Sequence, residues 1–200
     1  MSDTTSAPEA VPGTDDTCAL CGTTVRPGGF VMLNGHVACR PCAEEVANEV
    51  ADKQAGAGSV PMAAIGGALG AGLGAAVWAG ISIATDFEIG YVAVLVGFLA
   101  GMGVKLLSGG AHGTPLQVVA VVFAIVGLVL AKYVIFANAF SEVVLESYDV
   151  QVGWFAPETR EAFMEFAGEM FGGFDLLWVF LAATAAWRVP GSPQIEMQSE

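Results

Sequence analysis

Charged residues are scarce in this chain, and basic residues are scarcer still. Only 14% of the 200 residues are charged, and seven Lys and Arg stand against 20 Asp and Glu. So little charge excludes the ordinary water-exposed surface of a soluble domain of this size. The formal net charge of −13 also argues against binding to nucleic acid, because a phosphate backbone attracts basic proteins.

A cleavable secretory signal is missing from the start of the chain. Residues 1–17, MSDTTSAPEAVPGTDDT, lack both a basic segment and an apolar core. The same residues are acidic, small and interrupted by Pro and Gly, which is typical of disorder. We therefore expect a disordered acidic tail at 1–17 that lies in the cytoplasm.

Apolar residues are plentiful, at 54% of the chain, and 26 residues are glycine. About 20 apolar residues in a helix cross a bilayer core of about 30 Å. Three such runs are expected within 61–140, and a fourth at 174–188 is long enough only if it includes Asp175 and the residues just before it. The sequence predicts an all-α membrane protein, a four-helix transmembrane bundle in contact with the lipid bilayer.

The positions of the few basic residues indicate how these spans are oriented in the membrane. Cytoplasmic loops of membrane proteins carry an excess of Lys and Arg. With the N-terminus inside, Lys53, Lys105 and Arg188 all fall on the cytoplasmic side, and only Arg160 falls outside. We expect both termini in the cytoplasm, with a disordered tail at 189–200.

The segment 141–173 then becomes an acidic outer segment. Within it, PETREAFMEFAGEMF predicts an amphipathic helix, and Pro157 suits its first turn. Its glutamates occupy one face. The other face is apolar and comprises Phe163, Phe166, Ala167, Met170 and Phe171. Such a helix fits the outer membrane interface, where it would cap the bundle or meet a partner protein.

The only four cysteines stand in two tight pairs near the N-terminus. Cys18 and Cys21, and Cys39 and Cys42, each enclose two residues, and 17 residues separate the pairs. This spacing is typical of a closed four-cysteine site for one structural Zn²⁺ in a reducing compartment. A catalytic metal would need a vacant position, and a redox role would need a thioredoxin-like context. His36 is a further possible ligand, although a solvated turn residue is the simpler interpretation.

The surrounding residues predict a compact zinc module at 18–53 followed by a linker at 54–60. Apolar residues on both sides of Asn34–Gly35 indicate a small hairpin, and AEEVANEVADK after the second pair indicates a helix. This arrangement resembles treble-clef zinc modules (zinc ribbons) of the LIM and B-box kind. The resemblance implies that the module binds another protein.

Small residues recur four apart in two of the apolar runs. Gly66, Gly70 and Gly74 share one helical face, and Gly97 and Gly101 repeat the spacing. A second face of the first run carries Ala68, Gly72, Ala76 and Gly80. Such faces let helix backbones approach closely, either within one bundle or between the copies of a homo-oligomer.

Two ionisable residues fall inside the apolar runs. The expected topology places Lys132 and Asp175 at similar depth near the outer surface, which suggests an intramembrane charge pair. The alternative is that Lys132 extends to the interface and Asp175 marks the end of its span. Asp86 and Glu88, in a short outer loop, are expected to be solvated.

Residues 67–134 also resemble uncharacterised bacterial multi-pass membrane proteins with an N-terminal zinc ribbon, through Trp78, Glu88-Ile89-Gly90-Tyr91 and Lys132-Tyr133. This resemblance implies a bacterial cytoplasmic (inner) membrane and no known activity. Because no nucleophile, acid–base pair or open metal site is visible, we expect no enzyme. The sequence favours a zinc-module adaptor or sensor that binds a cytoplasmic protein. The alternative is a small transporter or channel subunit that its zinc module regulates.

Overall fold

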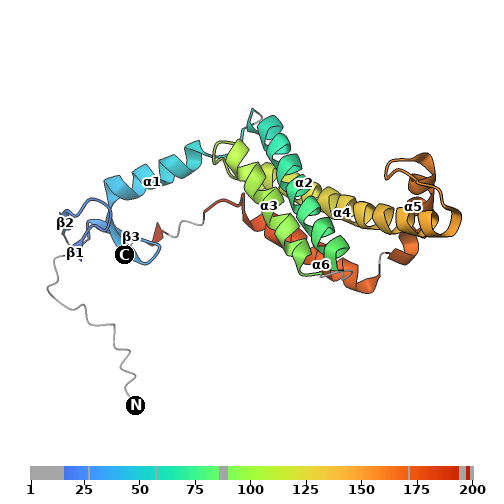
Figure 1. The fold of residues 1–200 in the computed structure, drawn as a ribbon. Helices are drawn as coiled ribbons and strands as arrows, with labels where there is room; N and C mark the ends of the chain where they lie inside the picture. The colour runs from blue at the N-terminus through green and yellow to red at the C-terminus, as the bar shows by residue number, and fades with distance from the viewer. Residues whose placement is uncertain are drawn as a thin grey trace, which may run out of the picture. The chain divides into compact units, whose positions relative to one another are not determined.

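The structure is a computed structural model, and it describes residues 16–26, 28–56, 58–85, 90–170, 172–193 and 197–198. Most of the expected acidic tail and the loop residues Asp86 and Glu88 lie outside these ranges. The chain is mostly helical (71%), with six helices and a small N-terminal sheet in the part described, as the sequence predicts. It divides into two units, one of residues 1–52 with 193–200 and one of residues 53–192 (Figure 1).

The first unit contains the segment in which the sequence predicts a zinc module, and it is built from short strands and one helix. Its elements are β1 (Asp16–Thr17), β2 (Thr24–Val25), β3 (Phe30–Leu33), β4 (His36–Cys39), α1 (Arg40–Asp52) and β5 (Met197–Gln198). Strands β3 and β4 form an antiparallel hairpin. Asn34 and Gly35 turn between them with φ of 51° and 80°, the left-handed conformation that such a two-residue turn requires.

Residues 197 and 198 form a strand, although a disordered tail is expected at 189–200. Strand β5 pairs antiparallel with β3, where Met32 lies opposite Gln198 and Leu33 opposite Met197. The physical reason is that β4 occupies only one edge of β3. The other edge offers unpaired backbone groups that a strand from elsewhere in the chain can satisfy.

The described residues of the second unit form five helices. They are α2 (Ser59–Thr85), α3 (Val92–Leu107), α4 (Thr114–Tyr148), α5 (Pro157–Met170) and α6 (Gly173–Arg188). Helices α3 and α4 pack on each other, and each of them also packs on α2 and α6 (Figure 1). The core between these helices consists largely of alanine with a few larger residues such as Leu116, Trp78 and Val96. Small core residues allow the close helix packing that is common in membranes.

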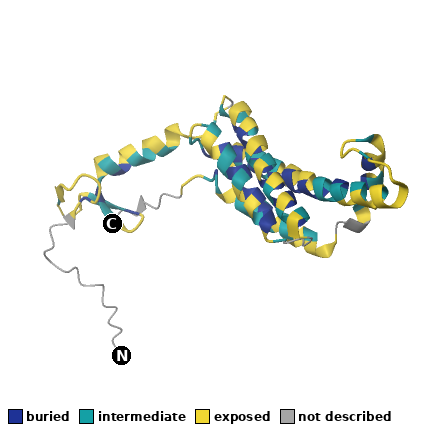
Figure 2. Ribbon diagram, in the orientation of Figure 1, coloured by how far each residue is buried: buried dark blue, intermediate teal, exposed yellow. Residues whose placement is uncertain are grey.

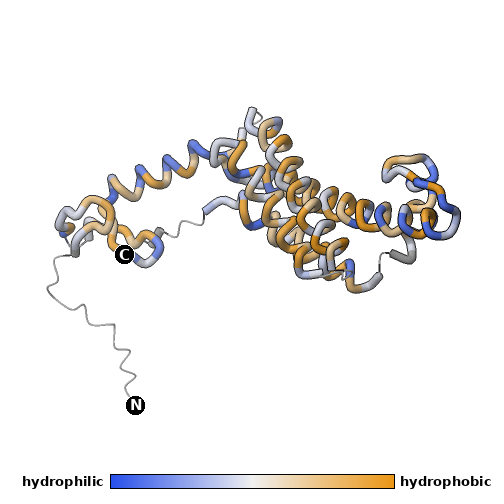
Figure 3. The backbone as a smooth tube through the Cα atoms, in the orientation of Figure 1, coloured by the Kyte–Doolittle hydropathy of each residue, from blue (hydrophilic) through white to orange (hydrophobic). Residues whose placement is uncertain are grey.

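The outer surface of these helices is apolar. Leu69, Leu73 and Phe180 are 65%, 59% and 67% exposed, although a soluble bundle would turn such residues inward. The buried positions face the neighbouring helices (Figure 2), and the tube is coloured as hydrophobic along most of α2, α3 and α4 (Figure 3). This combination fits a protein whose second unit is surrounded by lipid.

Two helices in the described ranges, α2 and α4, are long and apolar enough to cross a membrane. The α5–α6 pair passes the same test only if its two arms, bent by 102°, count as one broken span, and α3 is a shorter apolar helix. At about 1.5 Å per residue, the 16 residues of α3 reach about 24 Å, less than a bilayer core of about 30 Å. The structure therefore supports two or three of the four expected spans.

Helix α4 continues beyond the run expected to end near 140. It ends at Tyr148, where Asp149 adopts the left-handed conformation with φ of 55° and its N–H bonds to the carbonyl of Leu145. The following chain returns along α4, and α5 packs on α4 through Phe163, whose ring meets the rings of Tyr133 and Phe136 edge-on. The apolar face expected for α5 is thus partly used within the protein, while Phe166 is exposed.

The start of the segment 54–60, which is expected to be a flexible linker, is bonded to the loop between α3 and α4. Gln54 forms a parallel bridge with His112 in the α3–α4 loop. His112 N–H donates to the carbonyl of Lys53 at 3.0 Å, and Ala55 N–H donates to the carbonyl of His112 at 2.8 Å. Gly113 N–H donates to the carbonyl of Pro190 at 3.1 Å. One short loop therefore holds the backbone both before α2 and after α6.

Candidate metal centre and buried ion pair

The backbone of the first unit brings the two cysteine pairs together. Cys18 and Cys21 lie in the tight turn between β1 and β2, where Gly22 has φ of 71° and donates its N–H to the carbonyl of Cys18 at 2.9 Å. Cys39 ends β4, and Cys42 lies in the first turn of α1. A hairpin between the pairs and a helix after the second are the elements that the sequence predicts.

The four sulfur atoms lie within 4.8 Å of one another, so this cluster could bind a metal ion. Cys21 Sγ and Cys39 Sγ are 3.8 Å apart. Sulfur atoms bound tetrahedrally at about 2.3 Å from one zinc ion lie about 3.8 Å apart, so the spacing suits zinc. Cys18 is buried, while Cys21 is exposed and the other two are half-buried. The expected convergence of the four cysteines is confirmed.

Hydrogen bonds and crowding act in opposite directions on these thiols. The backbone N–H of Cys39, 3.3 Å from Cys18 Sγ, contributes most to lowering the pKa of Cys18 to about 6. Hydrogen bonds to the side chain and backbone of Thr23 lower the pKa of Cys21. The neighbouring Cys39 and Cys21 thiols raise the pKa of Cys42 to about 12. Four thiolates this close repel one another, and a divalent cation among them would remove that penalty.

The second unit contains a buried ion pair. Lys132 Nζ lies 3.1 Å from Asp175 Oδ1, and the two side chains are 6% and 21% exposed. Asp175 is in the first turn of α6, and its Oδ2 accepts the N–H of Gly172 at 2.9 Å. The structure thus brings together two residues that lie on different helices and far apart in the sequence.

Five glycines of the expected packing faces lie against a neighbouring helix. Gly66 and Gly70 face the carbonyls of Gly103 and Leu99 in α3, so a Cβ at either position would meet backbone atoms. A Cβ at Gly74 would lie 2.8 Å from the Cα of Val96. Gly97 in the same way faces the carbonyl of Ala182 in α6. A Cβ at Gly101 would lie 3.0 Å from the carbonyl oxygen of Ala186. These five glycines serve contacts within one chain.

The second small-residue face of α2 has no such neighbour. An added Cβ at Gly72 or Gly80 would meet nothing within 4 Å, and Ala68 and Ala76 are exposed. By residue spacing alone, both faces of α2 are equally suited to helix packing. The sequence analysis therefore missed that one face is already occupied and that the other is open.

The sequence does not predict one further contact. Tyr133 OH donates to the carbonyl of Trp154 at 2.6 Å, and its ring stacks on Phe155 with centroids 6.1 Å apart. These contacts fix the chain after α4 against the C-terminal half of that helix. Aromatic residues at a membrane boundary are a weak signal for such an arrangement, and no spacing rule pairs them.

Comparison with protein-family models, with curated proteins and with solved structures finds no match for this chain. The resemblance to zinc-ribbon membrane proteins therefore stays a prediction. The proposed function is therefore based on the geometry of the site.

Proposed function

We propose that this protein is a non-enzymatic membrane adaptor or sensor, whose zinc module binds a cytoplasmic protein. The observation that carries the proposal is the convergence of four Sγ atoms within 4.8 Å in a unit that continues into apolar helices. A cluster of four thiolates offers no position for substrate once it surrounds a zinc ion, so its role is structural. A structural zinc ion rigidifies a fragment that is too small to fold on its own core.

The core of the module is correspondingly small. Cys18, Leu33, Ala38 and Ala43 form it, with a few half-buried apolar neighbours. Leu20, between the first two cysteines, is 54% exposed and is the one exposed large apolar side chain within residues 17–26 and 28–52. A large apolar residue held on a rigid turn is a suitable anchor for a protein partner.

The proposal places the chain in the bacterial cytoplasmic membrane with both termini inside. The distribution of Lys53, Lys105 and Arg188 against Arg160 supports this orientation. A four-span arrangement agrees with it: α2, α3, α4 and α6 cross, the short α3 and α6 being tolerated because they pack against longer neighbours. Nucleic acid is not a proposed partner, given the net charge of −13.

Crosslinked affinity purification from native membranes tests the adaptor function. Wild type is compared with Cys39→Ser/Cys42→Ser, which removes two ligands, and with Leu20→Ser, which keeps all four. A partner that is captured by wild type, lost with the double variant and weakened with Leu20→Ser supports the proposal. Identical sets of captured proteins for all three, with each variant inserted in the membrane, would contradict it.

The Lys132–Asp175 pair favours a second candidate, a small transporter or channel subunit. Ionisable residues inside a membrane often line an ion or substrate path. This candidate predicts ion leakage from liposomes that contain the purified protein, and a leak that changes when Lys132 is replaced by Gln. The adaptor function predicts neither effect.

A further inference from the structure

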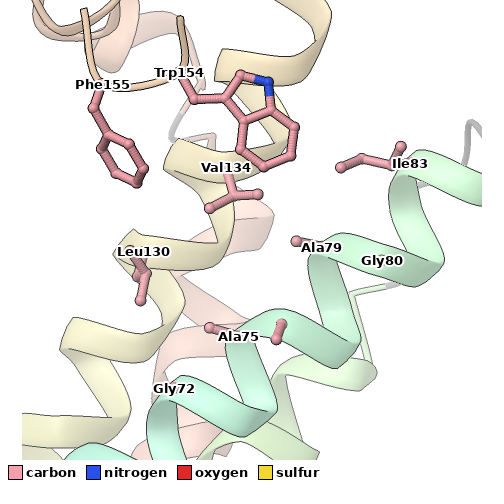
Figure 4. Close-up of a pocket in the computed structure, with 10 residues that line it drawn as sticks. Gly72, Ala75, Ala79, Gly80, Ile83, Leu130, Val134, Trp154 and Phe155 are labelled. Carbon is pink, nitrogen blue, oxygen red and sulfur yellow. The ribbon is translucent and has the colours of Figure 1, made fainter.

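A groove with a volume of about 450 Å³ lies between α2 and α4 on the outside of the second unit. Its floor is the stretch of α2 from Gly72 to Ile83, and Leu130 and Val134 of α4 form a wall (Figure 4). The lining residues are glycine, alanine or large apolar residues. The volume is within the range of roughly 300–1,000 Å³ that is common for small-molecule pockets.

The floor is deep because of its glycines. A Cβ at Gly72 or Gly80 would meet nothing within 4 Å, so their missing side chains leave open space. On the opposite side of α2, the missing side chains of Gly66 and Gly70 allow close contact with α3. The open glycines therefore form a recess that the packing of the helices does not use.

One end of the groove is closed by an aromatic roof made of Trp154 and Phe155. In Figure 4 the Trp154 ring lies across the space between Val134 and Ile83. Tyr133 fixes the roof through its 2.6 Å hydrogen bond to the Trp154 carbonyl and by stacking on Phe155. The groove is thus bounded at one end, and it is formed by two helices and a loop that is bonded to one of them.

The dimensions of the groove indicate its occupant. From Gly72 to Ile83 the α2 backbone rises by about 16 Å, which is about half of a 30 Å bilayer core and so the depth of one lipid leaflet. A transmembrane helix is about 10–12 Å wide, and the Trp154 and Phe155 rings obstruct one end of the groove for an occupant of that width. A single flexible hydrocarbon chain fits below the roof.

We propose that this groove binds one acyl chain of a membrane phospholipid, with the headgroup beside the Trp154 roof. The proposal goes beyond the adaptor function and rests only on the membrane location of α2 and α4. Because lipid and groove are equally apolar, selectivity comes from close packing of the chain against Gly72 and Gly80. Trp154, with an apolar ring and a polar N–H, suits the level at which the acyl chain meets the headgroup.

Native mass spectrometry of the full chain in detergent, mixed with palmitoyl-oleoyl phosphatidylethanolamine, tests the site. The groove is filled in Gly72→Leu/Gly80→Leu, and both positions admit a side chain. The matched control is Ala68→Leu, one turn earlier on the same exposed face and outside the groove. We expect wild type and the control to retain one lipid, and the double variant to lose about tenfold in the lipid-bound fraction.

Trp154→Ala keeps the test decisive if the double variant misfolds, because it removes one of the two rings of the roof and leaves both helices unchanged. Lipid retention should fall in this variant as well. A wild type without retained lipid, or equal retention in all variants, would overturn the proposal. A wild-type dimer that Gly72→Leu/Gly80→Leu dissociates would overturn it too, and would assign the groove to a second copy of the chain.

Discussion

Lys132 Nζ and Asp175 Oδ1 lie 3.1 Å apart in the interior of the apolar unit, with the Lys132 side chain 6% exposed. An isolated charge at such a position is expensive, and an ion pair lowers that cost. Asp175 also accepts the Gly172 N–H, so its carboxylate both neutralises a cation and caps the first turn of α6. The pair explains how the 16-residue helix α6 can carry an acidic residue in its first turn within an apolar unit.

Removal of one member of the pair should destabilise the protein more than removal of both. Lys132→Met leaves the half-buried Asp175 carboxylate without its ammonium partner, and breaking a fully buried pair costs about 3–5 kcal/mol, so the loss here should approach the lower end of that range. Lys132→Met/Asp175→Asn removes both charges, keeps an oxygen for the Gly172 N–H, and should recover a large part of that loss. Thermal unfolding in detergent, followed by circular dichroism, measures the difference.

The single variant Asp175→Asn is the control for this pair. It leaves the Lys132 ammonium buried and should also be less stable than the double variant. If the losses of the two single variants simply add up in the double variant, the two charges do not depend on each other, and the pair has no stabilising role.

Metal removal should unfold the first unit and leave the second intact. Folding of small zinc modules depends on metal binding, because thiolates that crowd together need the cation. We expect one zinc ion per chain by elemental analysis, and loss of protection of the β3–β4 hairpin in hydrogen exchange after a strong chelator is added. Slow exchange in α2 and α4 should persist. A hairpin that stays protected without metal would contradict a structural role for zinc.

Two glycines of α2 that are two residues apart should respond in opposite ways to the same change. Gly70 faces the Leu99 carbonyl, so Gly70→Leu forces α2 and α3 apart and should cost about 1–3 kcal/mol or more. Gly72 faces open space, so Gly72→Leu should stay within about 0.5 kcal/mol. Unfolding midpoints of the two variants in detergent compare the effects directly. Equal losses would mean that Gly70 does not set the α2–α3 distance.

Features that depend on local spacing could be predicted from the sequence. The two Cys-x-x-Cys pairs around an Asn34–Gly35 turn predict a common metal site, because each pair and the hairpin are local structures. The long apolar runs predict α2 and α4, because composition alone decides whether a helix suits lipid. The pairing of Lys132 with Asp175 can be predicted from the sequence only because spans that alternate in direction place the two residues at similar depth.

Contacts between distant segments could not be predicted in this way. The pairing of Met197 with Leu33, and of Gln54 with His112, depends on which backbone edges remain open after the rest of the chain has folded. No periodicity in either segment indicates which backbone edges remain open. The two small-residue faces of α2 are equivalent by spacing, and only the position of α3 distinguishes Gly70 from Gly72.

The hydrogen bond between Tyr133 and Trp154 should determine the local stability of the loop at 150–156. Tyr133→Phe keeps the ring that stacks on Phe155 and removes only the hydroxyl donor. A lost hydrogen bond of about 1 kcal/mol should raise the hydrogen-exchange rate of this loop about fivefold. Tyr148→Phe is the matched control, because Tyr148 is 76% exposed and its change should leave the loop unaffected. Equal exchange in Tyr133→Phe and wild type would show that Ser141 and Thr159, which bond to the carbonyls of Val152 and Gly153, hold the loop without Tyr133.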